Sequence, residues 1–334
     1  MKSLLFLYFF VAMAFSAVAS SVSESYVIPY PQQMVVGDGH FVLQKNASFS
    51  CNLKGADKED FVKYVGQSPF ALTYKKRGKT DIVFKLLSPK QSQMKEEAYR
   101  LEVTEKGIQV EATSASGLFY AFQSMNQLVQ PAGNNTFLLP EVTIEDAPRF
   151  AYRGMHLDVS RHFYTKEFVK KQLDALARYK LNRFHWHLTD DQGWRLPMDK
   201  YPLLTTVGAT APDVVITDYR AKKQYKAGKP YGPYSYTKEE IKDIVDYAKK
   251  LHIEVVPEVD MPGHFVAAMV AYPELSCDPK ADRKVWDHGG VSRDVLNVAN
   301  PAAVKLGEDV IDQLAELFPY PYIHIGGDEC PTVA

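Results

Sequence analysis

The fold is decided by the stretch Tyr322-Ile323-His324-Ile325-Gly326-Gly327-Asp328-Glu329-Cys330, in which an apolar segment ends in two glycines and two carboxylates. The apolar segment predicts a short buried strand, because strands of a parallel α/β sheet are apolar along their length and carry polar residues where they end. Gly326 and Gly327 would let a ligand or another backbone approach closely. Asp328 and Glu329 are therefore expected at the carboxyl end of a strand.

Upstream of this stretch, strand patterns alternate with helix patterns that begin at N-cap residues. The sequence Tyr-Thr-Lys-Glu occurs at residues 164–167 and again at 236–239, each time about one helix before a strand that ends in Asp. We therefore predict a repeated helix–strand unit. The predicted strands are 153–159, 183–188 and 253–259, and the predicted helices begin at Thr165, Thr237 and Asn300.

The alternation predicts an α/β domain over residues 149–334, of the (β/α)8 TIM-barrel type. A doubly wound sheet has the same local pattern, but no glycine-rich dinucleotide loop follows any predicted strand. Four strands are predicted where a closed barrel has about eight, so we expect only about the first half of a barrel. The open strand edges of a half barrel predict self-association or poor solubility.

In front of the barrel, residues 21–148 are predicted to form a small α+β domain. They hold no carboxylate cluster, histidine constellation or phosphate loop, so we assign them no chemistry. Asn134 and the two prolines Pro140 and Pro148 are interpreted as a linker. The predicted strands are 41–43, 81–86, 99–103 and 107–112, and the predicted helix covers residues 116–129.

The N-terminal segment 1–20 has the pattern of a secretory signal peptide: a lysine, a short apolar run and small residues before a cleavage site. It predicts a secreted or periplasmic protein with no membrane span in the mature chain. The net charge of −1 gives no basic surplus for nucleic acid. In an oxidising compartment Cys277 and Cys330 could form a disulfide, or both could stay free.

Polar side chains gather where each predicted strand ends. An Asp–Glu pair such as 328–329 is often only a solvated surface feature, and an arginine there is often only part of a surface ion pair. Because the carboxyl ends of barrel strands meet on one face, however, these side chains are expected to form one site. An acid kept protonated beside one kept ionised is what glycoside hydrolysis requires. The candidate residues are Arg161, Asp190, Asp260, His264, Asp328 and Glu329.

Four blocks of the sequence resemble, in the same order, the signature blocks of glycoside hydrolase family 20, the β-N-acetylhexosaminidases. The N-terminal region also resembles the small domain that precedes the barrel in that family, so the resemblance covers nearly the whole chain after the signal segment. The blocks are Asp158-Val159-Ser160-Arg161, His185-Trp186-His187-Leu188-Thr189-Asp190-Asp191-Gln192-Gly193-Trp194-Arg195, Glu258-Val259-Asp260-Met261-Pro262-Gly263-His264 and His324-Ile325-Gly326-Gly327-Asp328-Glu329.

The resemblance implies exo-acting removal of terminal non-reducing N-acetyl-β-D-hexosamine from a glycan or chitooligosaccharide, with retention and without metal or cofactor. The acetamide group of the substrate would act as the nucleophile, which explains how two adjacent carboxylates suffice. Glu329 would be the general acid/base and Asp328 would hold the acetamide N–H. The other implied roles are binding of sugar hydroxyls by Arg161, a hydrogen-bond network behind Glu329 formed by Asp190 and His264, and support from Asp260.

Two other functions are weighed against this one. His185-x-His187 places two imidazoles on one face of a strand, as in metal-dependent barrel hydrolases. A non-catalytic sugar-binding remnant of the enzyme is the second alternative, since half a barrel would lack later pocket residues. The presence of both Asp328 and Glu329 argues against a non-catalytic remnant. The natural glycan, and the choice between glucosamine and galactosamine derivatives, stay open.

Overall fold

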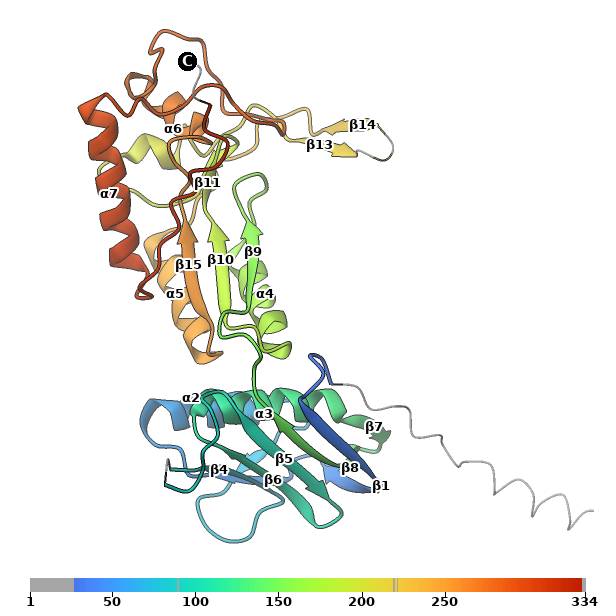
Figure 1. Ribbon diagram of the computed structural model, residues 1–334. Helices are drawn as coiled ribbons and strands as arrows, with labels where there is room; N and C mark the ends of the chain where they lie inside the picture. Colours follow the sequence, from blue (N-terminus) through green and yellow to red (C-terminus); the bar gives the residue numbers. More distant parts are fainter. Residues whose placement is uncertain (1–26, 89, 219, 221, 332–334) are drawn as a thin grey trace, which may run out of the picture. The chain divides into compact units, whose positions relative to one another are not determined.

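The computed structural model describes residues 27–331 apart from 89, 219 and 221 (Figure 1). The chain divides into two compact units, the first ending at Pro148 and the second beginning at Arg149. The proposed signal segment, residues 1–20, lies outside the described residues. In the part of the chain that is described, none of the helices has both the length and the apolar character needed to cross a membrane.

The first unit is an eight-stranded mixed sheet with two helices on one face (Figure 1). Strands β1, β8, β5, β6, β4, β2 and β3 are neighbours in that order, and β7 pairs with β8. Phenylalanine and tyrosine rings fill the core between the sheet and the helices. The elements are β1 (Gln33–Gln44), β2 (Ser48–Cys51), α2 (Gly55–Gly66), β3 (Thr73–Tyr74), β4 (Ile82–Leu86), β5 (Tyr99–Thr104), β6 (Gly107–Ala112), α3 (Ala115–Leu128), β7 (Gln130–Gly133) and β8 (Thr136–Asp146).

The interpretation of Asn134 to Pro148 as a linker is wrong for most of that segment. Residues Thr136–Asp146 form β8, which lies between β1 and β5 inside the sheet. Pro140 has no N–H to donate, and it pairs with His40 next to the register shift in β1 between Val36 and His40. A proline is tolerated within a sheet at such an irregularity, so its presence did not exclude a strand.

The second unit is built on three parallel strands, β9 (Gly154–Asp158), β10 (Arg183–His187) and β15 (Glu254–Glu258), in the order β15-β10-β9. Helix α4 (Lys166–Arg178) connects β9 to β10, and α5 (Lys238–Lys250) precedes β15. These two helices pack against each other, and α5 also contacts α7 (Pro301–Leu317). The unit therefore has the α/β architecture that the sequence predicted.

The predicted helix starts are confirmed, because local side-chain chemistry determines them. The Thr165 side chain accepts a hydrogen bond from the N–H of Phe168, and Asn300 accepts one from Ala302. Thr237 and Glu240 form a complete capping box at the start of α5. Each cap satisfies N–H groups that the first helical turn leaves without a partner.

The predicted fourth strand is not formed as a regular strand: residues 322–325 lie beside β15 in the predicted parallel direction, but they form only an isolated bridge, and they are not buried. The N–H of Val259 donates to His324 O at 3.2 Å, and the N–H of His324 donates to Pro257 O at 3.0 Å, so the segment runs parallel to β15. Only one bridge pair, Glu258 with His324, is regular. Tyr322 is 63% and Ile325 52% exposed, because no described element packs on the outer side of this segment.

A long insertion between β10 and α5 is held by one buried cation, Arg195. Its guanidinium donates to four carbonyl oxygens, Ser160 at 2.6 Å, Tyr234 at 2.8 Å, and Val159 and Ala209 at 3.2 Å. Burial lowers the pKa of Arg195 to about 10. The insertion contains β11 (Thr189–Asp190), β12 (Gly193–Trp194), η1 (Pro202–Thr205), β13 (Val215–Asp218) and β14 (Lys223–Lys226); α6 (Val266–Ala271) and η2 (Pro273–Leu275) follow β15.

Candidate active site

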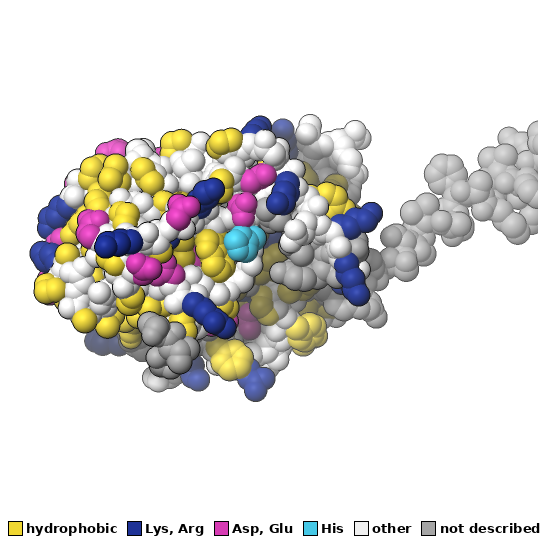
Figure 2. Space-filling model, turned by 90° about the horizontal axis from the view of Figure 1, so that it is seen from above, with side chains coloured by type: hydrophobic (Ala, Val, Ile, Leu, Met, Phe, Trp, Pro, Cys, Tyr) yellow, Lys and Arg dark blue, Asp and Glu magenta, His cyan; other side chains and the backbone are white. Residues whose placement is uncertain are grey.

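The predicted site residues lie where β9, β10 and β15 end. Asp158, His187 and Glu258 are the last residues of these strands and are paired in register, so they form one row across the sheet. The face in Figure 2, seen from above, carries acidic side chains, basic side chains and a histidine close together. Charged groups that converge at the carboxyl ends of parallel strands are typical of an active site in this architecture.

His264 connects two of the predicted acids. Its Nε2 lies 3.0 Å from Oε2 of Glu329, and its Nδ1 lies 3.2 Å from Oδ1 of Asp190. The hydrogen bond to Asp190 raises the pKa of His264 to about 9, against the opposing effect of burial. The raised pKa favours the imidazolium form of the ring, which lies between the buried side chain of Asp190 and the carboxyl group of Glu329.

Asp190 is the buried centre of this network, with 1% of its surface exposed. Besides His264, it lies 2.6 Å from Nη2 of Arg161 and 2.9 Å from Nε2 of His187, and it accepts from the N–H of Asp191 at 2.6 Å. Burial alone would raise the pKa of Asp190, but the surrounding donors lower it to about 2. Asp190 is therefore a fixed negative charge that orients its neighbours.

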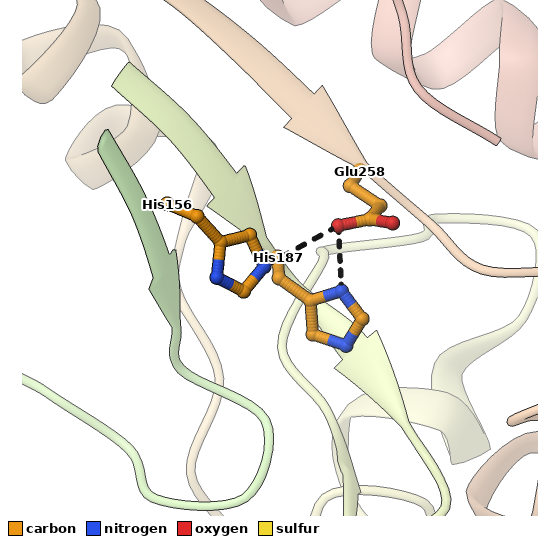
Figure 3. Close-up of side chains that lie close together, drawn as sticks. All are labelled: His156, His187 and Glu258. Carbon is orange, nitrogen blue, oxygen red and sulfur yellow. Dashed lines mark hydrogen bonds and ion pairs between the residues drawn. The ribbon is translucent and has the colours of Figure 1, made fainter. Parts of the chain in front are cut away.

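His187, Glu258 and Asp191 belong to this network, although the sequence analysis gave none of them a role in the proposed site. Nδ1 of His187 lies 2.7 Å from Oε2 of Glu258 (Figure 3). The hydrogen bonds to Asp190 and Glu258 outweigh burial and raise the pKa of His187 to about 10. Burial raises the pKa of Asp191 to about 6. The two-residue alternation that places His187 and Glu258 on the inner face of their strands was the available signal.

Arg161 is held by two carboxylates. Its Nη1 lies 2.9 Å from Oδ2 of Asp158, and its Nη2 contacts Asp190. Burial would lower the pKa of Arg161, but Asp190 and Asp158 outweigh burial and raise it. The side chain is 37% exposed, so the guanidinium is oriented by protein groups and still reaches solvent at the site. This placement is compatible with the predicted contact to sugar hydroxyls.

Asp328 and Glu329 follow a turn that only glycine can form. A Cβ on Gly326, whose φ is 64°, would lie 1.8 Å from Oδ1 of Asp260. The N–H of Gly327 donates to the same oxygen at 2.9 Å. The prediction that Gly326 permits the close approach of another segment is confirmed. Burial, together with the nearby Asp328, raises the pKa of Asp260 to about 7.

The two predicted catalytic acids are exposed. The Glu329 side chain is 55% exposed, and Asp328 is also in the exposed class. His264 supports Glu329 from the protein side, while Asp328 lies near Asp260. The arrangement leaves both carboxylates accessible to a ligand. Cys277 and Cys330 are free thiols, so of the two predicted alternatives the structure has the unpaired one.

Several groups of described side chains are close enough to share a cation. One group is Asp190, Asp191 and His264, and another is Asp260, His264 and Asp328. In both groups the histidine Nδ1 or Nε2 already contacts a carboxylate of the network described above. Two further groups surround Glu258 and include His156, His185, His187 and His324.

Two family models match the chain. The glycosyl hydrolase family 20 catalytic domain matches residues 150–334, and domain 2 of the same family matches residues 24–147. With this match, the α/β unit fits a TIM-barrel enzyme family.

Individual relatives agree with the family models. The beta-hexosaminidase of Vibrio furnissii is 36% identical over 321 residues, which cover 94% of this chain and 50% of that protein. The beta-hexosaminidase of Porphyromonas gingivalis is 44% identical over 246 residues, 71% of this chain and 30% of that protein. The chain thus spans between about a third and a half of the length of these curated relatives.

Solved structures are similar as well. The Streptomyces plicatus N-acetyl-beta-hexosaminidase, in complex with Thio-NAglucal, has a TM-score of 0.79 at 36% identity and covers 91% of this chain and 59% of its own. The exo beta-N-acetylglucosaminidase of Vibrio harveyi, in complex with N-acetylglucosamine, has a TM-score of 0.78 at 34% identity, over 92% of this chain and 47% of its own.

Proposed function

Because the chain belongs to glycosyl hydrolase family 20, we propose that it carries the acid/base residue of a site that hydrolyses terminal, non-reducing N-acetyl-β-D-hexosamine residues of glycans. The observation that carries this proposal is the contact of His264 with both Glu329 and Asp190. It places the candidate acid against a buried, charged network at the carboxyl ends of parallel strands. Glycans or chitooligosaccharides are the proposed substrates.

The proposed mechanism uses the acetamide group of the substrate. Glu329 donates its proton to the glycosidic oxygen as the bond to the anomeric carbon breaks. The acetamide carbonyl oxygen attacks that carbon, and Asp328 accepts a hydrogen bond from the acetamide N–H. Water then opens the oxazolinium intermediate and gives its proton to Glu329, so the anomeric configuration is retained overall. Asp328 and Glu329 are adjacent and both exposed, which supports simultaneous contact with one sugar.

The first experiment measures nitrophenol release from a nitrophenyl N-acetyl-β-glucosaminide by the chain, by Glu329→Gln and by Glu308→Gln. Glu308 lies on α7 with a 63% exposed side chain and is the matched control. We expect loss of turnover in Glu329→Gln alone, by a factor of about 100 or more, since general acid catalysis contributes about that much. Equal rates for wild type and Glu329→Gln would contradict the assignment.

Fluorinated acetamides test the nucleophile separately. Fluorine withdraws electrons from the carbonyl oxygen, so the rate should fall progressively from the acetyl to the trifluoroacetyl substrate if this oxygen attacks the anomeric carbon. A rate independent of fluorination would exclude the acetamide as nucleophile while leaving Glu329 as a general acid.

We expect weak turnover from this chain alone, because the Glu329 side chain is 55% exposed and water therefore competes for it. Binding of N-acetylglucosamine without hydrolysis would favour the sugar-binding alternative.

We also propose that the exposed segment 322–325 beside β15 drives self-association. Sedimentation velocity at increasing concentration tests this, and a monomer at all concentrations would contradict it.

We propose that residues 1–20 direct export, which would place the protein outside the cytoplasm or in the periplasm. Cell fractionation of the intact chain and of a variant that begins at residue 21 tests this. Export of both forms to the same extent would contradict the proposal.

A further inference from the structure

Four histidines surround the carboxylate of Glu258, on the strands that carry the candidate active site. His156 comes from β9, His185 and His187 from β10, and His324 from the segment beside β15. Figure 3 shows His156 and His187 turned toward Glu258. The Glu258 side chain is only 6% exposed, whereas those of His156 and His324 are 49% and 48% exposed, so the cluster is buried on the carboxylate side and open to solvent on the other.

His187 is already committed to two carboxylates. Its Nδ1 lies 2.7 Å from Glu258 and its Nε2 lies 2.9 Å from Asp190. Each ring nitrogen thus faces a carboxylate oxygen at hydrogen-bond distance, and Nη1 of Arg161 also lies 3.3 Å from Nε2, so neither nitrogen is open to another partner. His187 therefore belongs to the network of the candidate active site. The other three histidines are left to be explained.

His185 and His324 lie close to the carboxylate of Glu258 without forming a regular hydrogen bond to it. Nε2 of His185 is buried and lies 2.8 Å from Oε2 of Glu258, yet its geometry forms no hydrogen bond. Nδ1 of His324 accepts a hydrogen bond from the N–H of Gly326 at 3.1 Å, while it lies 2.9 Å from Oε1 of Glu258. An acceptor nitrogen thus faces an acceptor oxygen, and a shared cation would relieve the repulsion.

From this geometry we propose that His185, His324 and Glu258 form a binding site for a divalent transition-metal ion such as Zn²⁺. Their ligand atoms lie within 4.8 Å of one another. In a tetrahedral zinc site with bonds of about 2.0–2.2 Å, ligand atoms are about 3.3 Å apart, so small side-chain rotations complete the site. Two imidazoles and one carboxylate favour zinc, copper or nickel over magnesium or calcium.

His156 is the fourth ligand candidate. Its Nε2 lies 3.7 Å from Oε2 of Glu258, and its ring packs edge-on against the ring of His185 with centroids 4.7 Å apart. A bound ion would draw Glu258 away from His187 and so connect the metal to the Asp190 network. The site differs from the metal-dependent hydrolase considered from the sequence, because that reading required His187 as a ligand. The proposal does not rest on the proposed glycosidase function.

Titration calorimetry with Zn²⁺ tests the proposal on the full chain, freed of chelator and of any histidine tag. His324→Ala is the main variant, since its side chain is 48% exposed and its loss should not unfold the protein. His185→Ala is the second variant, and His288→Ala, at an exposed histidine outside the cluster, is the matched control. Circular dichroism checks that each variant is folded.

We expect saturable one-to-one binding to wild type and to His288→Ala, and binding at least about tenfold weaker in His324→Ala and His185→Ala. Co²⁺ substitution should give the visible absorption of a tetrahedral site in wild type and lose it in both variants. The Glu329→Gln chain should bind like wild type, which separates this site from the proposed chemistry. Absence of binding to wild type, or unchanged affinity in both variants, would overturn the proposal.

Discussion

His264 is the residue whose charge the network depends on most directly. Its ring, 2% exposed, faces the carboxylates of Asp190, Asp191 and Glu329, and Asp260 adds a further negative charge nearby. These groups raise its pKa to about 9, whereas the pKa of a histidine in the unfolded chain is about 6.5. A raised folded-state pKa means that the imidazolium stabilises the fold fully below about pH 6.5 and that this contribution is lost as the pH rises through about 9.

We therefore expect the stability gap between wild type and His264→Gln to be largest near pH 6.5 and to narrow by pH 9.5. Urea unfolding of both chains at these two pH values measures it. His288→Gln, at an exposed ring outside the network, controls for general effects of losing a histidine. A gap that stays constant over this range would show that His264 is not held as an imidazolium.

Gly326 and Gly327 provide a matched pair at the turn before the acids. A Cβ at Gly326 would clash with Asp260, whereas a Cβ at Gly327 would have nothing within 4 Å. Both residues have positive φ, so Gly327→Ala carries only the backbone cost of about 1–2 kcal/mol. Gly326→Ala must in addition displace the turn that positions Glu329.

We expect Gly326→Ala to lower kcat/KM by about 100-fold relative to Gly327→Ala, since a displacement of about 1 Å at a catalytic group has an effect of that order. Hydrogen exchange of residues 324–329 gives a second readout, in which Gly326→Ala exchanges faster. Similar behaviour of the two variants would mean that the contact with Asp260 does not position the acids.

At the scale of elements, Arg195 connects the loop after β9 to the insertion between β10 and α5. Arg195→Lys leaves at least one of these four carbonyl groups without its side-chain donor, because an ammonium has three donors and a shorter reach, while Ala209 O keeps the N–H of Tyr234 as a partner. Each buried carbonyl left unpaired costs about 1–3 kcal/mol, so we expect a loss of about 3 kcal/mol. Urea unfolding followed by tryptophan fluorescence measures it. Arg293→Lys, at an exposed position, should change stability by less than about 0.5 kcal/mol.

The sequence allowed prediction of helices and strands whose signals are local. It did not allow prediction of contacts between residues far apart in the chain, or of burial that depends on another element. Apolar periodicity and caps at Thr165 and Thr237 predicted the helices correctly. Alternation could place His187 and Glu258 on one face of their strands, but the contact between them depends on strand register, and the contacts of Arg195 with distant carbonyls depend on loop packing; neither is contained in a local pattern. Burial of residues 322–325 failed as a prediction for the same reason, because an apolar segment is buried only where another element covers it.

At the scale of the whole molecule, each unit has its own core, and all three tryptophans lie in the second one, at positions 186, 194 and 286. Tryptophan fluorescence therefore reports the second unit alone, while far-ultraviolet circular dichroism reports both. We expect urea unfolding to give two transitions by circular dichroism, of which fluorescence follows one. Units with separate cores unfold as separate cooperative blocks when few interactions couple them.

One variant in each unit makes this expectation decisive. Phe84 is 1% exposed and packs against Phe49, Phe61 and Phe122, so Phe84→Ala should destabilise the first unit by about 3–5 kcal/mol. Phe84→Ala should shift only the transition of the first unit, which tryptophan fluorescence does not detect. Arg195→Lys should shift only the transition of the second unit, which tryptophan fluorescence detects. If each variant moves both transitions together, the two units unfold as one cooperative block, and the candidate active site depends on the first unit for its stability.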